Sequence, residues 1–186
     1  MRRFDFKSIF LGNAFFHVGL ILLFACGGVV AILFGKGGSD FLSPLFEDYF
    51  LLVFYDGKLF SQFLSRAVNN LALCVIFSAP FLFKWLLVLP IVAVVYRGYV
   101  FGVVMLNVVG IFGISGALVC IFLLIPMQFA LQFVLNGLAI KSFCINGCNG
   151  KEYFVNLAIY YLLSLAVALF EVVIIIVFIR PLSFII

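Results

Sequence analysis

The sequence predicts an all-α membrane protein, a polytopic bundle of about five transmembrane helices with a short amphipathic helical segment outside the membrane. Of its 186 residues, 67% are hydrophobic and 10% are charged, whereas soluble domains carry about 25% charged residues. Eleven basic and seven acidic side chains are too few to cover a water-exposed surface. Apolar runs of about 20 residues, the length that crosses a bilayer, recur between short polar breaks. The bilayer is therefore the expected environment.

The expected spans follow one another along the chain. Residues 1–13 form a basic cytoplasmic amino terminus, and residues 14–35 form the first span. This run exceeds the apolar core of about 7–15 residues found in cleaved signal peptides, so we interpret it as a signal anchor. Residues 67–186 are expected to form the membrane bundle, with Lys84 in a tight turn. The four spans of the bundle are predicted at residues 67–83, 85–106, 117–140 and 153–179.

Residues 36–66 are predicted to lie outside the membrane core. They hold four of the seven acidic residues, and Ser43-Pro44 is typical of a helix start. Apolar and polar side chains take opposite faces of the predicted helix near residue 60, which favours short helices on the membrane surface. The segment is the expected docking surface for a partner. The candidate docking residues are Glu47, Asp48, Phe60 and Phe63.

Basic residues favour a cytoplasmic amino terminus. With five spans, six Lys and Arg side chains collect on the cytoplasmic side and four outside, as the positive-inside rule requires. One alternative concerns the fourth segment, where Pro126 could break the helix into a re-entrant pair. The carboxyl terminus would then return to the cytoplasm.

Two charged residues lie inside the apolar runs. A charge at mid-membrane depth costs at least about 2.5–3.5 kcal/mol, so Arg97 and Glu171 are expected to form an ion pair across the bundle. A structural pair that fixes helix packing is the favoured interpretation, and a proton or ion relay is the alternative.

Uncharged polar residues form two further stripes. Gln128, Gln132 and Asn136 recur at four-residue spacing on the fourth span, and Asn156 shares a face of the fifth span with Tyr160, Ser164 and Glu171. These faces are predicted to turn inward. Interhelical hydrogen bonding is the simpler interpretation, and a substrate path is the alternative.

Small residues suggest where helices approach closely. Gly98 and Gly102 form a Gly-x-x-x-Gly pair, and Gly113 and Gly116 follow in the next connection. Together with Pro126 they are expected to serve helix packing, with a homo-oligomer interface as the alternative.

No residue set indicates catalysis, a cofactor or a metal site. The only histidine, His17, lies at the first membrane boundary, where an interfacial hydrogen bond is expected. A phosphate-binding glycine loop and a Ser-His-Asp set are both absent from the sequence. The basic residues are too dispersed for nucleic-acid binding. The sequence therefore predicts a protein that is not an enzyme.

The central region resembles the stage II sporulation protein M family. The likeness rests on residues 96–102 (Tyr-Arg-Gly-Tyr-Val-Phe-Gly), 113–116 (Gly-Ile-Ser-Gly) and 125–128 (Ile-Pro-Met-Gln). The family typically shows a basic residue before Gly, a second Gly four residues later, a Gly-x-x-Gly-like turn and a Leu-Pro-Gln-Asn-like element. Here Arg97 stands where the family often has Lys, and the proline element differs in three of its four letters. The motifs cover about sixty residues, and the layout of spans is similar over most of the chain.

The resemblance implies a multi-pass protein of the bacterial cytoplasmic membrane that catalyses no reaction. Such a protein would anchor peptidoglycan hydrolases, a lytic transglycosylase and an amidase, during engulfment of the forespore.

The alternative function is a membrane component of a transporter, such as a permease associated with an ABC ATPase. That function would use Arg97, Gln128 and Glu171 inside the membrane.

Overall fold

The computed structural model describes residues 14–34, 59–144 and 150–174, which are almost entirely helical and contain no strand. Two short 3-10 helices, Ala79–Phe81 and Lys84–Leu87, connect the second and third long helices, and a π-helix, Cys120–Leu124, precedes the fourth. The predicted all-α bundle is confirmed. The long helices are α2 (Ala14–Phe34), α4 (Leu59–Ser78), α5 (Val88–Val119), α6 (Ile125–Cys144) and α7 (Gly150–Ile174).

Five helical stretches among the described residues are long and apolar enough to cross a membrane, and the chain is a multi-pass membrane protein. The turn expected at Lys84 is present between the second and third stretches. The fourth stretch, where Pro126 suggested a re-entrant pair, is 28 residues long and long enough to cross. The five stretches are Ala14–Phe34, Phe63–Phe81, Lys84–Gly110, Gly116–Phe143 and Gly150–Val173.

The start of α4 differs from the sequence prediction. Residues 59–66 belong to the same continuous helix as the second span, whereas the sequence placed them in a separate surface segment. Arg66 is accordingly buried, with 9% of its surface exposed. A charged side chain can enter the bundle at this point because a carboxylate on α7 meets it there. The rest of the expected docking segment, including Glu47 and Asp48, lies outside the described residues.

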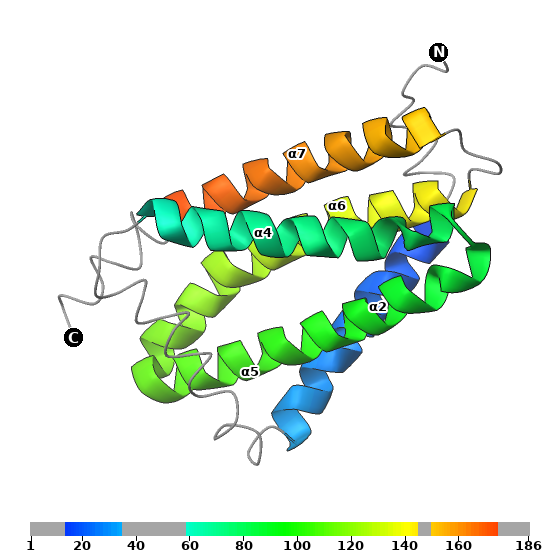
Figure 1. Cartoon of the computed structure of the whole chain (residues 1–186). Coiled ribbons are helices and arrows are strands. Elements are labelled where there is room, and N and C mark those ends of the chain that lie inside the picture. The colour runs from blue at the N-terminus through cyan, green and yellow to red at the C-terminus, as the bar shows by residue number, and fades with distance from the viewer. Residues whose placement is uncertain (1–13, 35–58, 145–149, 175–186) are drawn as a thin grey trace.

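Helices α2 and α5 cross in close contact through small residues (Figure 1). A Cβ atom added at Gly98 would collide with the backbone carbonyl of Phe24, and one at Gly102 would lie 2.7 Å from the carbonyl oxygen of Gly28. Small residues permit this approach between membrane helices. Gly98 and Gly102 therefore pack within the chain, and Gly27 on α2 makes an equally close contact with the backbone of α5.

Gly113 has a different role from the one predicted. Its φ of 57° and ψ of −131° interrupt α5 between the third and fourth spans, a conformation that glycine adopts far more readily than other residues. A Cβ atom there would meet nothing within 4 Å. The prediction that Gly113 serves close packing is therefore wrong, because the residue makes the turn between two spans. Gly116, just beyond it, is buried.

Pro126 lies in the second position of α6, directly after the π-helix. A proline is tolerated in the first turn of a helix, where its missing N–H group has no intrahelical partner. The widened π turn provides such a starting point inside the fourth span. Pro126 thus modifies the helix at this position without ending the span.

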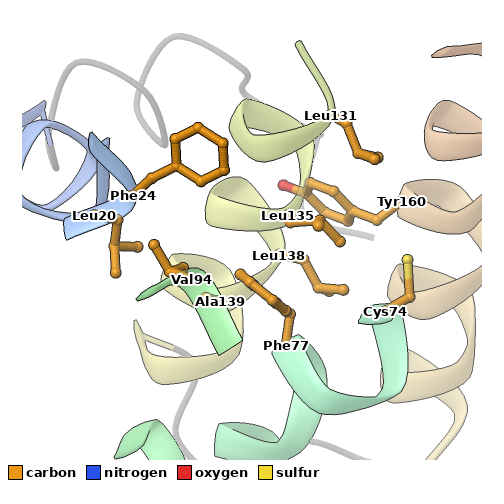
Figure 2. Packing of buried hydrophobic residues seen from close by; sticks show 10 residues of the cluster. All are labelled: Leu20, Phe24, Cys74, Phe77, Val94, Leu131, Leu135, Leu138, Ala139 and Tyr160. Carbon is orange, nitrogen blue, oxygen red and sulfur yellow. The ribbon is translucent and has the colours of Figure 1, made fainter. Parts of the chain in front are cut away.

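Apolar side chains from all five helices meet in one core (Figure 2). Helices α4 and α7 lie side by side, and α6 packs against both (Figure 1). Large apolar side chains such as Phe15, Trp85 and Ile114 are exposed on the outer surface, as expected where a bundle faces lipid. The buried core consists of Leu20, Phe24, Cys74, Phe77, Val94, Leu131, Leu135, Leu138, Ala139 and Tyr160.

Candidate functional site in the bundle interior

A polar stripe runs along α4. Arg66, Asn70, Cys74 and Ser78 recur every fourth residue, so they share one face of the helix. All four are buried. Because α4 and α7 are neighbours, this face lies against α7. We call the contacts between the two helices the α4–α7 seam.

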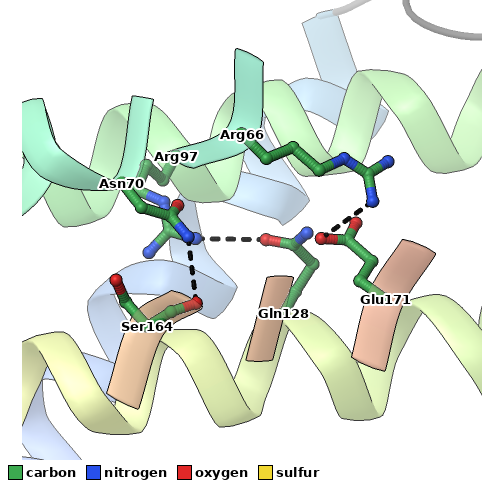
Figure 3. Close-up of polar contacts among 6 residues, drawn as sticks. All are labelled: Arg66, Asn70, Arg97, Gln128, Ser164 and Glu171. Carbon is green, nitrogen blue, oxygen red and sulfur yellow. Dashed lines mark hydrogen bonds and ion pairs between the residues drawn. The ribbon is translucent and has the colours of Figure 1, made fainter. Parts of the chain in front are cut away.

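The seam is closed by polar contacts along its length. The Nη1 atom of Arg66 lies 3.3 Å from Oε2 of Glu171 in a salt bridge. One turn further, Nδ2 of Asn70 donates a hydrogen bond to the backbone oxygen of Ser164 at 3.2 Å (Figure 3). At the other end of α4, the hydroxyls of Ser78 and Tyr153 are 3.0 Å apart. Polar groups in hydrocarbon need such partners, so these contacts hold α4 against α7.

Two weaker contacts complete the seam. The thiol of Cys74 lies 4.0 Å from the hydroxyl oxygen of Ser164. The hydroxyl of Tyr161 donates a hydrogen bond to the backbone oxygen of Ala67 at 3.3 Å. The seam therefore consists of Arg66, Ala67, Asn70, Cys74 and Ser78 on α4 with Tyr153, Tyr161, Ser164 and Glu171 on α7.

Glu171 thus has a different salt-bridge partner from the one that the sequence predicted. The salt bridge of this carboxylate is with Arg66, and both side chains are about nine-tenths buried. The sequence predicts Arg97 as the partner of Glu171 because it places residues 36–66, including Arg66, outside the membrane core. In the structure Arg66 enters the bundle on α4, the helix that packs beside α7.

Arg97 makes its hydrogen bonds with α6. Its Nη1 atom donates to Oε1 of Gln132 at 2.7 Å, and its Nη2 atom donates to Oε1 of Gln128 at 3.1 Å. Gln132 in turn donates from Nε2 to Oδ1 of Asn136 at 2.7 Å. The glutamine stripe expected to turn inward therefore supplies neutral acceptors for a half-buried guanidinium, a group that can only donate. We call Arg97, Gln128, Gln132 and Asn136 the Arg97 cluster.

The Arg97 cluster and the α4–α7 seam are close neighbours. Helix α4, which carries one side of the seam, contacts both α5 and α6, the helices that carry the Arg97 cluster. The two sets together place polar side chains of four helices in the interior of one bundle. Such an arrangement can hold helices in a fixed register, or it can offer a polar path through the membrane.

Other predicted residues have simpler surroundings. Asn156 is buried on α7, as its stripe predicted. His17 lies one turn from the start of the first span, where it is buried and its ring stacks on Phe133 with centroids 5.1 Å apart. On α4, Phe60 is 76% exposed and Phe63 is half-buried. Among the described residues, no group of three or more His, Cys, Asp or Glu side chains could hold a metal ion.

Sequence reasoning missed the α4 half of the seam. The four-residue spacing of Arg66, Asn70, Cys74 and Ser78 was visible, but the boundary drawn at residue 66 separated the arginine from the other three. It also missed Gly27, which provides the surface that α5 approaches. The first signal requires the knowledge that α4 begins before residue 66. The second requires the knowledge that α2 packs against α5.

No protein-family model matches the chain, and neither a curated protein nor a solved structure matches it. The chain is a multi-pass helical membrane protein whose interior polar side chains join neighbouring helices.

Proposed function

We propose that this protein is a non-enzymatic membrane scaffold. The observation that supports this function most is the pairing of the interior polar groups. Arg66 pairs with Glu171, and the amides of Gln128 and Gln132 accept hydrogen bonds from Arg97. Groups bonded to one another in this way hold helices together, and a rigid bundle is what an anchor for other proteins requires.

The proposed partners follow from the resemblance to the stage II sporulation protein M family. On this proposal the bundle lies in a bacterial cytoplasmic membrane and holds peptidoglycan hydrolases at its outer surface. The part of residues 36–66 that precedes the second span would carry the docking surface. Phe60 supports this assignment because it belongs to that part, lies at the start of α4, and exposes 76% of its surface. Large exposed aromatic side chains are frequent anchors in protein interfaces.

Affinity purification from the native membrane in mild detergent tests the proposal. We expect peptidoglycan hydrolases to copurify with the wild-type chain and to be lost from the Phe60→Ala variant. Phe15→Ala is the matched control, because Phe15 is an equally apolar and highly exposed residue at the start of α2. Recovery of no hydrolase with a properly inserted chain, or equal loss from both variants, would contradict the proposal.

A second candidate function is that of a transporter component. It is favoured by the length of the α4–α7 seam, in which polar contacts extend from Glu171 to Tyr153 within one span. A transport role requires the carboxylate of Glu171 to participate in moving an ion or substrate. Proteoliposomes containing the wild-type chain would then show flux that a Glu171→Gln variant lacks. Absence of flux under both proton and sodium gradients would reject this candidate.

A further inference from the structure

Among the described residues, two buried side-chain atoms on α6 and α7 have no hydrogen-bond partner. They are the hydroxyl oxygen of Tyr160 on α7 and the Nδ2 atom of Asn136 on α6. Tyr160 is 1% exposed and Asn136 is 0% exposed, so bulk water and lipid headgroups do not reach them. Buried polar groups in proteins are bonded in nearly every case, either to protein atoms or to ordered water.

The free donor of Asn136 is determined by the hydrogen bonds around it. The guanidinium of Arg97 can only donate, so Gln132 must present its oxygen to Arg97 and its nitrogen to Asn136. Asn136 therefore accepts through Oδ1, and its Nδ2 atom is left as the unused donor. Turning the amide of Asn136 over would place two donors against each other. A group that binds Nδ2 of Asn136 must therefore be a hydrogen-bond acceptor.

Tyr160 presents its hydroxyl to the neighbouring helix. Its ring lies in the apolar core with Leu131 and Leu135 of α6, and Figure 2 shows the oxygen pointing toward that helix. Asn136 follows Leu135 directly in the sequence. The adjacent residue of α7, Tyr161, behaves differently, because its hydroxyl donates to the backbone oxygen of Ala67.

We infer that the bundle interior holds bound water at these two groups, hydrogen-bonded to Nδ2 of Asn136 and to the hydroxyl of Tyr160. Water fits both groups because its oxygen accepts from the amide while it can either donate to or accept from a phenol. A halide would also accept from both groups. Burial of an ion inside a bundle carries a large desolvation penalty that a neutral molecule avoids. This inference goes beyond the proposed function and does not depend on it.

Water-edited solid-state NMR of the wild-type chain in lipid bilayers tests the inference directly. We expect magnetisation to pass from water to the ring of Tyr160 and to the side-chain amide of Asn136 several-fold faster than to Phe77, which is fully buried in the same core. Tyr160→Phe should remove the fast transfer at position 160, and the matched Tyr161→Phe variant should preserve it at Tyr160. Transfer to Tyr160 and Asn136 as slow as to Phe77 would show a dry site and overturn the inference.

The same samples distinguish water from a halide. Exchange of chloride for sulfate should leave the chemical shifts of Tyr160 and Asn136 unchanged if water is bound. Shifts that follow the chloride concentration would identify an anion as the occupant and would also overturn the inference.

Discussion

Replacing the residues of the buried ion pair between Arg66 and Glu171 should show how strongly the α4–α7 seam depends on it. At 3.3 Å and an effective dielectric constant of about 20, two unit charges attract by roughly 5 kcal/mol. Desolvation of both ions offsets much of this attraction. The loss of one partner is more costly, because it removes the opposite charge from a group that stays buried in the bundle. Arg66→Met and Glu171→Met should each destabilise the fold by about 3–5 kcal/mol.

The double variant distinguishes an electrostatic effect from a packing effect. With both charges replaced by methionine, neither remains buried without a partner, and the stability should return to within about 1 kcal/mol of the wild type. Steric trapping in bicelles measures the free energy of unfolding of all three variants. Lys151→Met, an exposed change at the start of α7, is the control and should alter stability by no more than about 0.5 kcal/mol. Additive losses in the double variant would show that the two side chains stabilise the bundle independently of their ion pair.

Further predictions concern the glycines, the Arg97 cluster and the membrane orientation. Gly98→Ala should destabilise the bundle by about 1–3 kcal/mol because the added Cβ atom meets the Phe24 backbone. Gly110→Ala, with open space around it, should be neutral or stabilise α5 by up to about 1 kcal/mol. Thermal unfolding of both variants tests this difference, and equal effects would contradict it. Gly113→Ala should cost about 1–3 kcal/mol in the same assay because of its positive φ. Gln132→Leu should cost about 2–3 kcal/mol by removing an acceptor of the Arg97 guanidinium, and an unchanged melting temperature would argue against the cluster. In a cysteine-free background, Lys84→Cys and Lys151→Cys should react with an impermeant maleimide from the same side of the membrane. Both positions lie at the end of the bundle where α4 ends and α7 begins. Labelling from opposite sides would contradict this arrangement of the helices.

The spans could be predicted from the sequence because hydropathy and length alone define them. The turn at Lys84 was equally accessible, since one charged residue interrupts a long apolar run. The partner of Glu171 could not be predicted in the same way. That contact depends on which helices are neighbours and on how each is rotated about its axis, and neither property follows from one helix at a time.

Glycine spacing shows a similar limit. Gly98 and Gly102 face α2, but Gly113 and Gly110 have no close neighbour. The residue type is the same at all four positions, and only the backbone conformation and the surrounding helices separate a packing glycine from a turn glycine. The inward orientation of Gln132 and Asn136 was predictable from their four-residue spacing, whereas the acceptor role of Gln132 required the position of Arg97.

On the proposed scaffold function, the buried polar contacts hold the helices together and take no direct part in the binding of partners. The most direct test is affinity purification of the Arg66→Met/Glu171→Met double variant from the native membrane. We expect this variant, inserted and folded without the ion pair, to recover the same hydrolases that the proposed function predicts for the wild type. Loss of these partners from a double variant with wild-type stability would contradict the claim and give the buried pair a direct functional role.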